Sequence, residues 1–111
     1  MLEERERAYE AKWAHDEEIR FELMARRNRR LGECVAKAMK LGGEDRRLYA
    51  EAVVRAGLSK GADPVFEKVR ADFAAHHVEC SDSEIHRKMR ELFDEAEAEI
   101  LTRNGRNGGR Q

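Results

Sequence analysis

Metal-binding side chains gather in one short stretch of the sequence. Its members are His76, His77, Cys80 and His86. Imidazole nitrogens and a cysteine thiolate are ligands that zinc prefers. Their spacing matches none of the familiar zinc motifs, and a histidine near a helix C-terminus also interacts favourably with the helix dipole. We therefore interpret them as helix-end residues and expect no metal and no cofactor.

A cluster of arginines could contact the phosphates of a nucleic acid. It consists of Arg26, Arg27, Arg29 and Arg30. No aromatic residues interleave with it, and Leu23 and Leu31 flank it as core positions. The net charge is −1, so the chain has no overall field that would attract nucleic acid. A solvated helix face is the favoured interpretation. Nucleic-acid binding stays an alternative that added salt would weaken steeply.

The sequence shows no pattern typical of an enzyme: no nucleophile paired with a base, no phosphate-binding glycine loop and no paired buried carboxylates. Cys34 and Cys80 lack a spacing pattern and are expected to be reduced, small apolar residues. No apolar run approaches the ~20 residues that span a bilayer, and the N-terminus does not resemble a signal or transit peptide. We predict a cytoplasmic, non-enzymatic protein without direct membrane insertion.

The elements that position these residues are predicted to be helices, because apolar residues recur with a 3.6-residue period. Charged residues make up 41% of the 111 residues, so the core must be small. The predicted helices span about residues 2–41, 45–56, 63–77 and 81–101. Amphipathic helices joined by short loops bury their apolar stripes against one another. The predicted fold is an all-α four-helix bundle.

Capping residues mark the predicted boundaries. Gly42 and Gly43 should end the first helix, Asp63 and Pro64 should begin the third, and residues 81–84 form a capping box. The predicted core positions are Ile19, Leu23, Met24, Leu31, Val35, Met39, Leu48, Tyr49, Ala52, Val53, Ala56, Val65, Phe66, Val69, Phe73, Ile85, Met89, Leu92, Phe93, Ala96 and Ile100. The acidic residues of the fourth helix are predicted to be exposed. They are Glu91, Asp94, Glu95, Glu97 and Glu99.

Residues 1–18 do not fit the bundle. Charges alternate densely, yet Tyr9 and Trp13 lie four residues apart, on the same side of a helix. Tyr, Trp and Arg are enriched at interface hot spots. Two interpretations stay open. In the first, the two aromatic residues extend the first helix and pack on the bundle. In the second, the segment binds a partner, and when free it is either a long helix or partly disordered. We predict a partner-binding segment (1–18), a four-helix domain (19–101) and a disordered tail (102–111).

Several runs resemble one protein family. Residues 5–21 (RERAYEAKWAHDEEIRF) and 25–32 (ARRNRRLG) are the most specific, and residues 63–73 (DPVFEKVRADF) and 81–92 agree with them. Over residues 4–100 the chain resembles the alphaproteobacterial ATP synthase inhibitor family, the zeta subunit. Trp13 stands where phenylalanine is more common. The resemblance implies a four-helix fold whose N-terminal segment inserts between the alpha and beta subunits of the enzyme's head, beside gamma. There it would become helical and block rotation in the hydrolytic direction, while sparing synthesis.

The resemblance also implies which residues contact the enzyme. They are Arg5, Ala8, Tyr9, Lys12, Trp13 and Asp16. Tyr9 and Trp13 would fill apolar pockets, while the charged residues would pair with carboxylates or, for Asp16, with a base. His15 lies in the same segment, and its titration near neutrality would make binding depend on pH. The predicted function is inhibition of ATP hydrolysis by a bacterial F-type ATP synthase, at the periphery of the inner membrane. The alternative is a helical adaptor for a different protein.

Overall fold

The computed structural model describes residues 16–108, with side chains as far as Arg103. Within this range the chain forms helices α2 (Glu17–Ala38), α3 (Gly43–Ala56), α4 (Pro64–Ala75) and α5 (Asp82–Gly108), and no strand. The predicted all-α, four-helix fold is confirmed. The first predicted helix was expected to begin at about Leu2, and residues 2–15 lie outside the described range.

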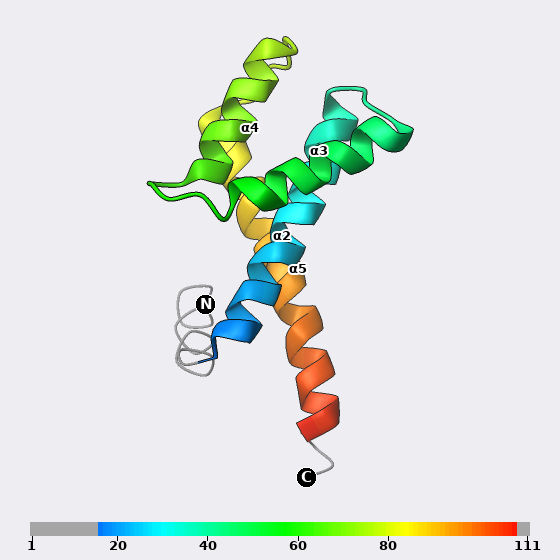
Figure 1. Ribbon diagram of the computed structural model, residues 1–111, viewed down its shortest axis with the longest axis vertical. Helices are drawn as coiled ribbons and strands as arrows, with labels where there is room; N and C mark the ends of the chain where they lie inside the picture. The colour runs from blue at the N-terminus through cyan, green and yellow to red at the C-terminus, as the bar shows by residue number, and fades with distance from the viewer. Residues whose placement is uncertain (1–15, 109–111) are drawn as a thin grey trace.

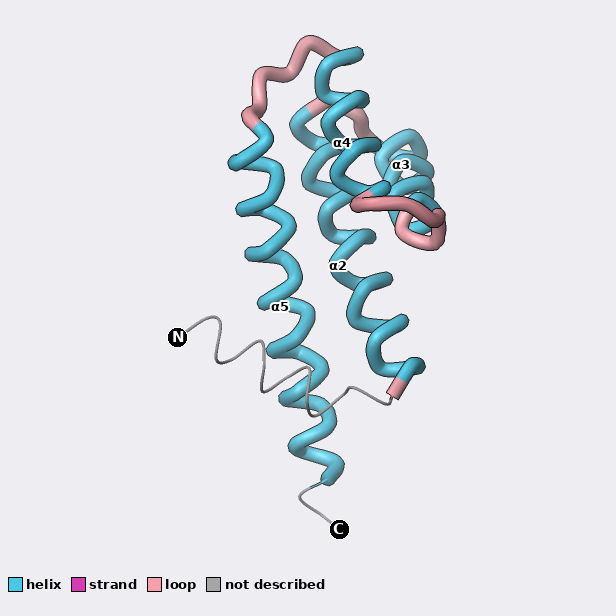
Figure 2. Tube along the Cα trace, turned by 90° about the vertical axis from the view of Figure 1, so that its left-hand side faces the viewer, coloured by secondary structure: helices cyan, strands magenta, loops and turns pink. Residues whose placement is uncertain are grey.

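The long helices α2 and α5 run antiparallel and side by side (Figures 1 and 2). α3 folds back across the second half of α2, and α4 packs beside the first half of α5. The molecule therefore has two regions. In the body, residues 31–92, all four helices pack together. In the arm, residues 17–30 and 93–108, α2 and α5 continue as a pair.

The body encloses the main hydrophobic core. Its buried residues are Leu31, Val35, Met39, Val53, Val65, Phe66, Val69, Phe73, Ile85, Met89 and Leu92, all at predicted core positions. α2 and α3 cross closely at Gly32, where an added Cβ would lie 2.6 Å from the Ala50 Cα. A glycine inside a helix costs conformational entropy, and the close crossing explains why this one is present.

The predicted caps of the last two helices are confirmed. The Ser81 backbone N–H donates to Glu84 Oε1 at 2.8 Å, and the Glu84 N–H donates back to Ser81 Oγ at 3.1 Å. The hydrogen bond from the Ser81 backbone N–H, the largest cause, lowers the pKa of Glu84 because it favours the charged carboxylate. Asp63 accepts from the Phe66 N–H at 3.3 Å, and Pro64 occupies the first turn of α4.

The end of α2 differs from the prediction. The helix stops at Ala38, and Lys40, with φ of 65°, takes the left-handed position that we assigned to the glycines. The Leu41 N–H then donates to the Ala36 carbonyl at 2.9 Å, and Leu41 packs against the body core. Gly42 instead serves as the N-cap of α3. The helix therefore ends before Leu41, and the turn that follows places Leu41 against the body core.

Three side chains are placed differently from their predictions. Met24 and Leu48 were predicted to be in the core, but they are 39% and 48% exposed. Glu97 was predicted to be exposed and is buried, beside Ala96 on the side of α5 that meets α2. α5 also continues to Gly108, beyond the domain end that we predicted at residue 101. Periodicity alone did not show how far each helix covers its neighbour.

Candidate partner-binding surface

Asp16 marks the junction between the N-terminal segment and the folded helices. Its carboxylate accepts a hydrogen bond from the Ile19 N–H at 3.0 Å and so caps α2. Glu17 and Glu18 follow in the first turn, where negative charge complements the helix dipole. Of the predicted contact residues, Asp16 is exposed at this junction. Arg5, Ala8, Tyr9, Lys12 and Trp13 lie outside the described residues, as does His15.

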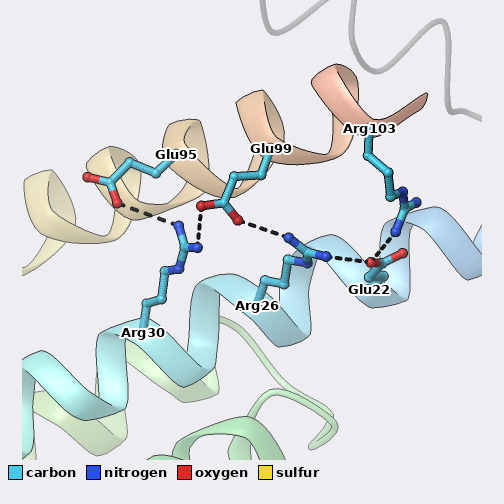
Figure 3. Close-up of polar contacts among 6 residues, drawn as sticks. All are labelled: Glu22, Arg26, Arg30, Glu95, Glu99 and Arg103. Carbon is cyan, nitrogen blue, oxygen red and sulfur yellow. Dashed lines mark hydrogen bonds and ion pairs between the residues drawn. The ribbon is translucent and has the colours of Figure 1, made fainter. Parts of the chain in front are cut away.

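A network of ion pairs joins the two helices of the arm (Figure 3). On α2, Arg26 donates to Glu22 at 3.1 Å and, across the helices, to Glu99 at 2.9 Å. Arg30 also bonds to Glu99 and lies 3.6 Å from Glu95. Arg103 closes the far end with a hydrogen bond of 2.6 Å to Glu22. Four of the six groups contact two groups of opposite charge, and these contacts link all six into one chain.

Hydrogen bonds within the network favour the charged forms of Glu22, Arg30 and Glu99 and shift their pKa values accordingly. A hydrogen bond from Arg103 lowers the pKa of Glu22, and one from Arg30 lowers the pKa of Glu99. The same contact with Glu99 raises the pKa of Arg30. Single surface ion pairs contribute little, whereas linked pairs with bidentate arginines contribute more. The network therefore helps to hold α2 against α5 at the base of the N-terminal segment.

Beneath the network, the arm has a small apolar seam. Leu23, Ala96 and Ile100 are buried there, and Ile19, Phe93 and Leu101 pack against them. This seam is separate from the body core. The arm is consequently held by a few apolar contacts together with the ion pairs.

The structure divides the arginine cluster rather than presenting it as one basic face. Arg26 and Arg30 are paired with carboxylates of α5. Arg27 is buried, donates from Nε to Asn28 Oδ1 at 2.8 Å, and has its pKa lowered by burial. Arg29 is exposed. This distribution disfavours the nucleic-acid alternative, because phosphate binding requires several accessible cations together.

The metal-binding candidates have other contacts in the structure. His76 Nδ1 lies 3.0 Å from the Asp72 carbonyl oxygen. The His86 ring stacks on Phe66 with 4.1 Å between centroids, and its Nε2 lies 3.5 Å from Asp63. From residue 16 to residue 108, no three His, Cys, Asp or Glu side chains are grouped so that they could hold a metal ion.

Cys34 and Cys80 are free thiols that line one pocket of the body, of about 360 Å³. Burial raises the pKa of Cys80, which favours the protonated thiol. The described part of the chain contains no helix long and apolar enough to cross a membrane.

A groove of about 410 Å³ opens along the first turns of α2, beside the end of α3. Phe21, Met24 and Leu58 line it and are 61%, 39% and 64% exposed. Glu17 and Arg20 lie at the same groove. This surface was not predicted from the sequence, because the apolar spacing placed Met24 in the core. Phe21, Met24 and Asn28 do form a second stripe on α2, but only the position of α3 shows that Asn28 is covered while Phe21 and Met24 are exposed.

These helices form a scaffold with an exposed apolar groove at the start of α2, next to the point where the charged N-terminal segment joins it, as in proteins that act by binding other proteins. The chain belongs to the ATPase inhibitor subunit zeta family, whose family model matches residues 1–99. The family predicted from the sequence is therefore confirmed, and the chain belongs among ATPase inhibitors. No curated protein and no solved structure matches it.

Proposed function

We propose that this protein inhibits ATP hydrolysis by the F-type ATP synthase, by inserting residues 1–18 at an alpha/beta catalytic interface of the enzyme's head. The observation that carries the proposal is the family match, because it spans the N-terminal segment as well as the helices. The inserted segment blocks rotation of gamma in the hydrolytic direction. The protein acts by steric obstruction, catalyses nothing, and is peripheral to the inner membrane through the enzyme.

The described helices can anchor a segment that is inserted into the enzyme. A segment that resists a turning rotor must be anchored, and here its C-terminal end joins a capped helix. Four cross-helix ion contacts tie that helix to α5 within its first four turns, from Glu22 to Arg30. Force on the segment is therefore passed to both helices of the arm and on to the body.

In this proposal Tyr9 and Trp13 occupy apolar pockets of the enzyme, where aromatic anchors supply most of the binding energy. Arg5 and Lys12 pair with carboxylates, and Ala8 allows close approach of the helix. Asp16 has two roles, because it caps α2 and also faces a basic group of the enzyme.

The test uses the synthase of the same organism, the full-length protein, and a version that lacks residues 1–15. This version keeps Asp16, so the cap of α2 is retained. We expect the full-length protein to suppress ATP hydrolysis and to leave ATP synthesis largely intact, whereas the shortened version has no effect. Equal inhibition by both versions would place the inhibitory element elsewhere. The absence of both binding and inhibition by the full-length protein would favour the alternative of an adaptor for a different protein.

A further inference from the structure

The apolar groove beside α2 is an uncovered helix-packing surface. Phe21, Met24 and Leu58 are among the few large hydrophobic side chains exposed on the described part of the chain, and all three line this groove. Exposed apolar residues that are scattered singly need no explanation, but a contiguous group with charged residues at its edge is typical of a protein interface.

The groove exists because α3 is too short to cover the whole of one face of α2, and the start of α2 is left exposed. α3 packs on α2 at Gly32 and ends at Ala56. Gly57 then lies against Asn28, where an added Cβ would be 2.3 Å from Nδ2. Beyond this point the same side of α2 continues through Met24 to Phe21, and no helix of the described range 16–108 lies over it. The occupant that fits is another helix, placed where α3 would have continued.

The surface is too small to hold a complex by itself. Three side chains that are 39% to 64% exposed present roughly 300 Å² of apolar area, whereas a standard interface needs about 800 Å² from each partner. A dimer of this chain built on the groove alone would not be stable. The groove can instead extend an interface that already begins nearby.

The proposed interface between the N-terminal segment and the synthase begins directly before the groove in the sequence. Glu17 lines the groove, and Asp16 joins α2 to the segment that we propose enters the synthase. At about 1.5 Å of rise per residue, Phe21 and Met24 lie roughly 8 and 12 Å along the helix from Asp16. When the segment is bound, the groove is therefore within reach of the subunits that form the mouth of the same cleft.

We propose that the groove is a second docking site for the synthase head. Its occupant is a surface helix of the alpha or beta subunit, which places aliphatic side chains between Phe21 and Leu58. Glu17 and Arg20 supply one charge of each sign at the edge, so the helix carries charged groups beside its apolar stripe. This inference rests on the proposed function, and it assigns part of the binding affinity to the folded helices.

The test compares inhibition curves of a Phe21→Gln, Leu58→Gln double variant, the wild type and a Leu48→Gln control. Leu48 is 48% exposed on α3 and does not line the groove, so it is a matched leucine outside the surface. We expect the double variant to need about tenfold more protein for half-maximal inhibition, with the same maximal inhibition because the blocking segment is intact. The control should match the wild type.

A photo-crosslinking residue at position 58 or 48 gives a second readout that does not depend on the glutamine variants folding. Position 58 should crosslink to alpha or beta in the complex, and position 48 should not. Unchanged half-inhibitory concentrations together with no crosslink from position 58 would overturn the docking site, while inhibition by the wild type would still support the proposed function. A wild-type dimer in sedimentation that the double variant abolishes would overturn it too, by showing that a second copy covers the groove.

Discussion

The body and the arm are built from the same two long helices but are stabilised in different ways. In the body, α3 and α4 cover α2 and α5, and bulky residues such as Leu31, Val69 and Phe73 are buried between them. In the arm, as far as the structure describes it, α2 and α5 are held together by a small seam and by ion pairs. The body core therefore contributes most of the stability of the fold. The arm is less well packed, and it carries the attachment point of the N-terminal segment and the exposed groove.

The largest expected effect comes from removing a leucine in each region. Leu31→Ala leaves a cavity among residues of all four helices, so it should lower the free energy of unfolding by about 3 kcal/mol. Leu23→Ala in the arm removes the same atoms, but only two helices have to close around the gap, so the loss should be smaller. Chemical denaturation measures both. Equal losses would mean that the arm is packed as tightly as the body.

The close crossing of α2 and α3 predicts the next effect. Gly32→Ala places a Cβ 2.6 Å from the Ala50 backbone, so it should cost about 1–3 kcal/mol although alanine favours helix. Gly42→Ser is the control, because no atom lies within 4 Å of its added Cβ and serine is a good N-cap. It should be neutral or slightly stabilising. A stabilising Gly32→Ala would show that the helices can separate without cost.

The capping box of α5 contributes to the body at one helix end. Ser81→Ala removes the hydroxyl that accepts from the Glu84 N–H, and it should cost about 1 kcal/mol. Thermal unfolding measures the change. Ser83→Ala serves as the control, because Ser83 lies in the first turn of α5 and takes no part in this pair of bonds. A loss of similar size in both variants would show that the effect does not come from the cap, and helix propensity could not explain it because alanine favours helix more than serine does.

The ion pairs of the arm should give the smallest effect, and one that depends on pH. The pKa of Glu99 is lowered in the folded state, so its contribution is present above the unfolded pKa and is lost as pH falls through the folded value. Glu99→Gln should therefore lower the melting temperature slightly at pH 7 and hardly at all near pH 3, and high salt should shrink the difference. A difference that persists at pH 3 would show that Glu99 acts through packing.

The sequence predicted the starts of the last two helices well, because local signals determine them. The Ser81–Glu84 capping box, the Asp63 cap and the apolar stripe of α4 depend on neighbours a few residues away. The pairing of Arg26 and Arg30 with Glu99 could not be predicted, because it depends on the register between α2 and α5. The groove was missed for a related reason: the exposure of Met24 depends on where α3 ends relative to α2.

Part of the candidate site came from family resemblance rather than from local physics. Spacing alone placed Tyr9 and Trp13 on one side of a helix, and it left open whether they face the bundle or a partner. The family match over residues 1–99 supports the inhibitor interpretation of the whole chain. The contact residues from Arg5 to Trp13 stay predictions, while Asp16 has a structural role as a cap that the sequence analysis did not assign.

Hydrogen exchange of the protein, free and bound to the synthase head, tests the account most directly. If the segment and the arm form the interface, binding should slow amide exchange in residues 1–30 and around Leu58. Exchange in α4, which extends to the opposite end of the molecule from the arm (Figure 1), should stay unchanged. Protection confined to α4 and the turn before α5, with none in residues 1–30, would contradict the central claim that the N-terminal segment and the arm carry the inhibitory contact.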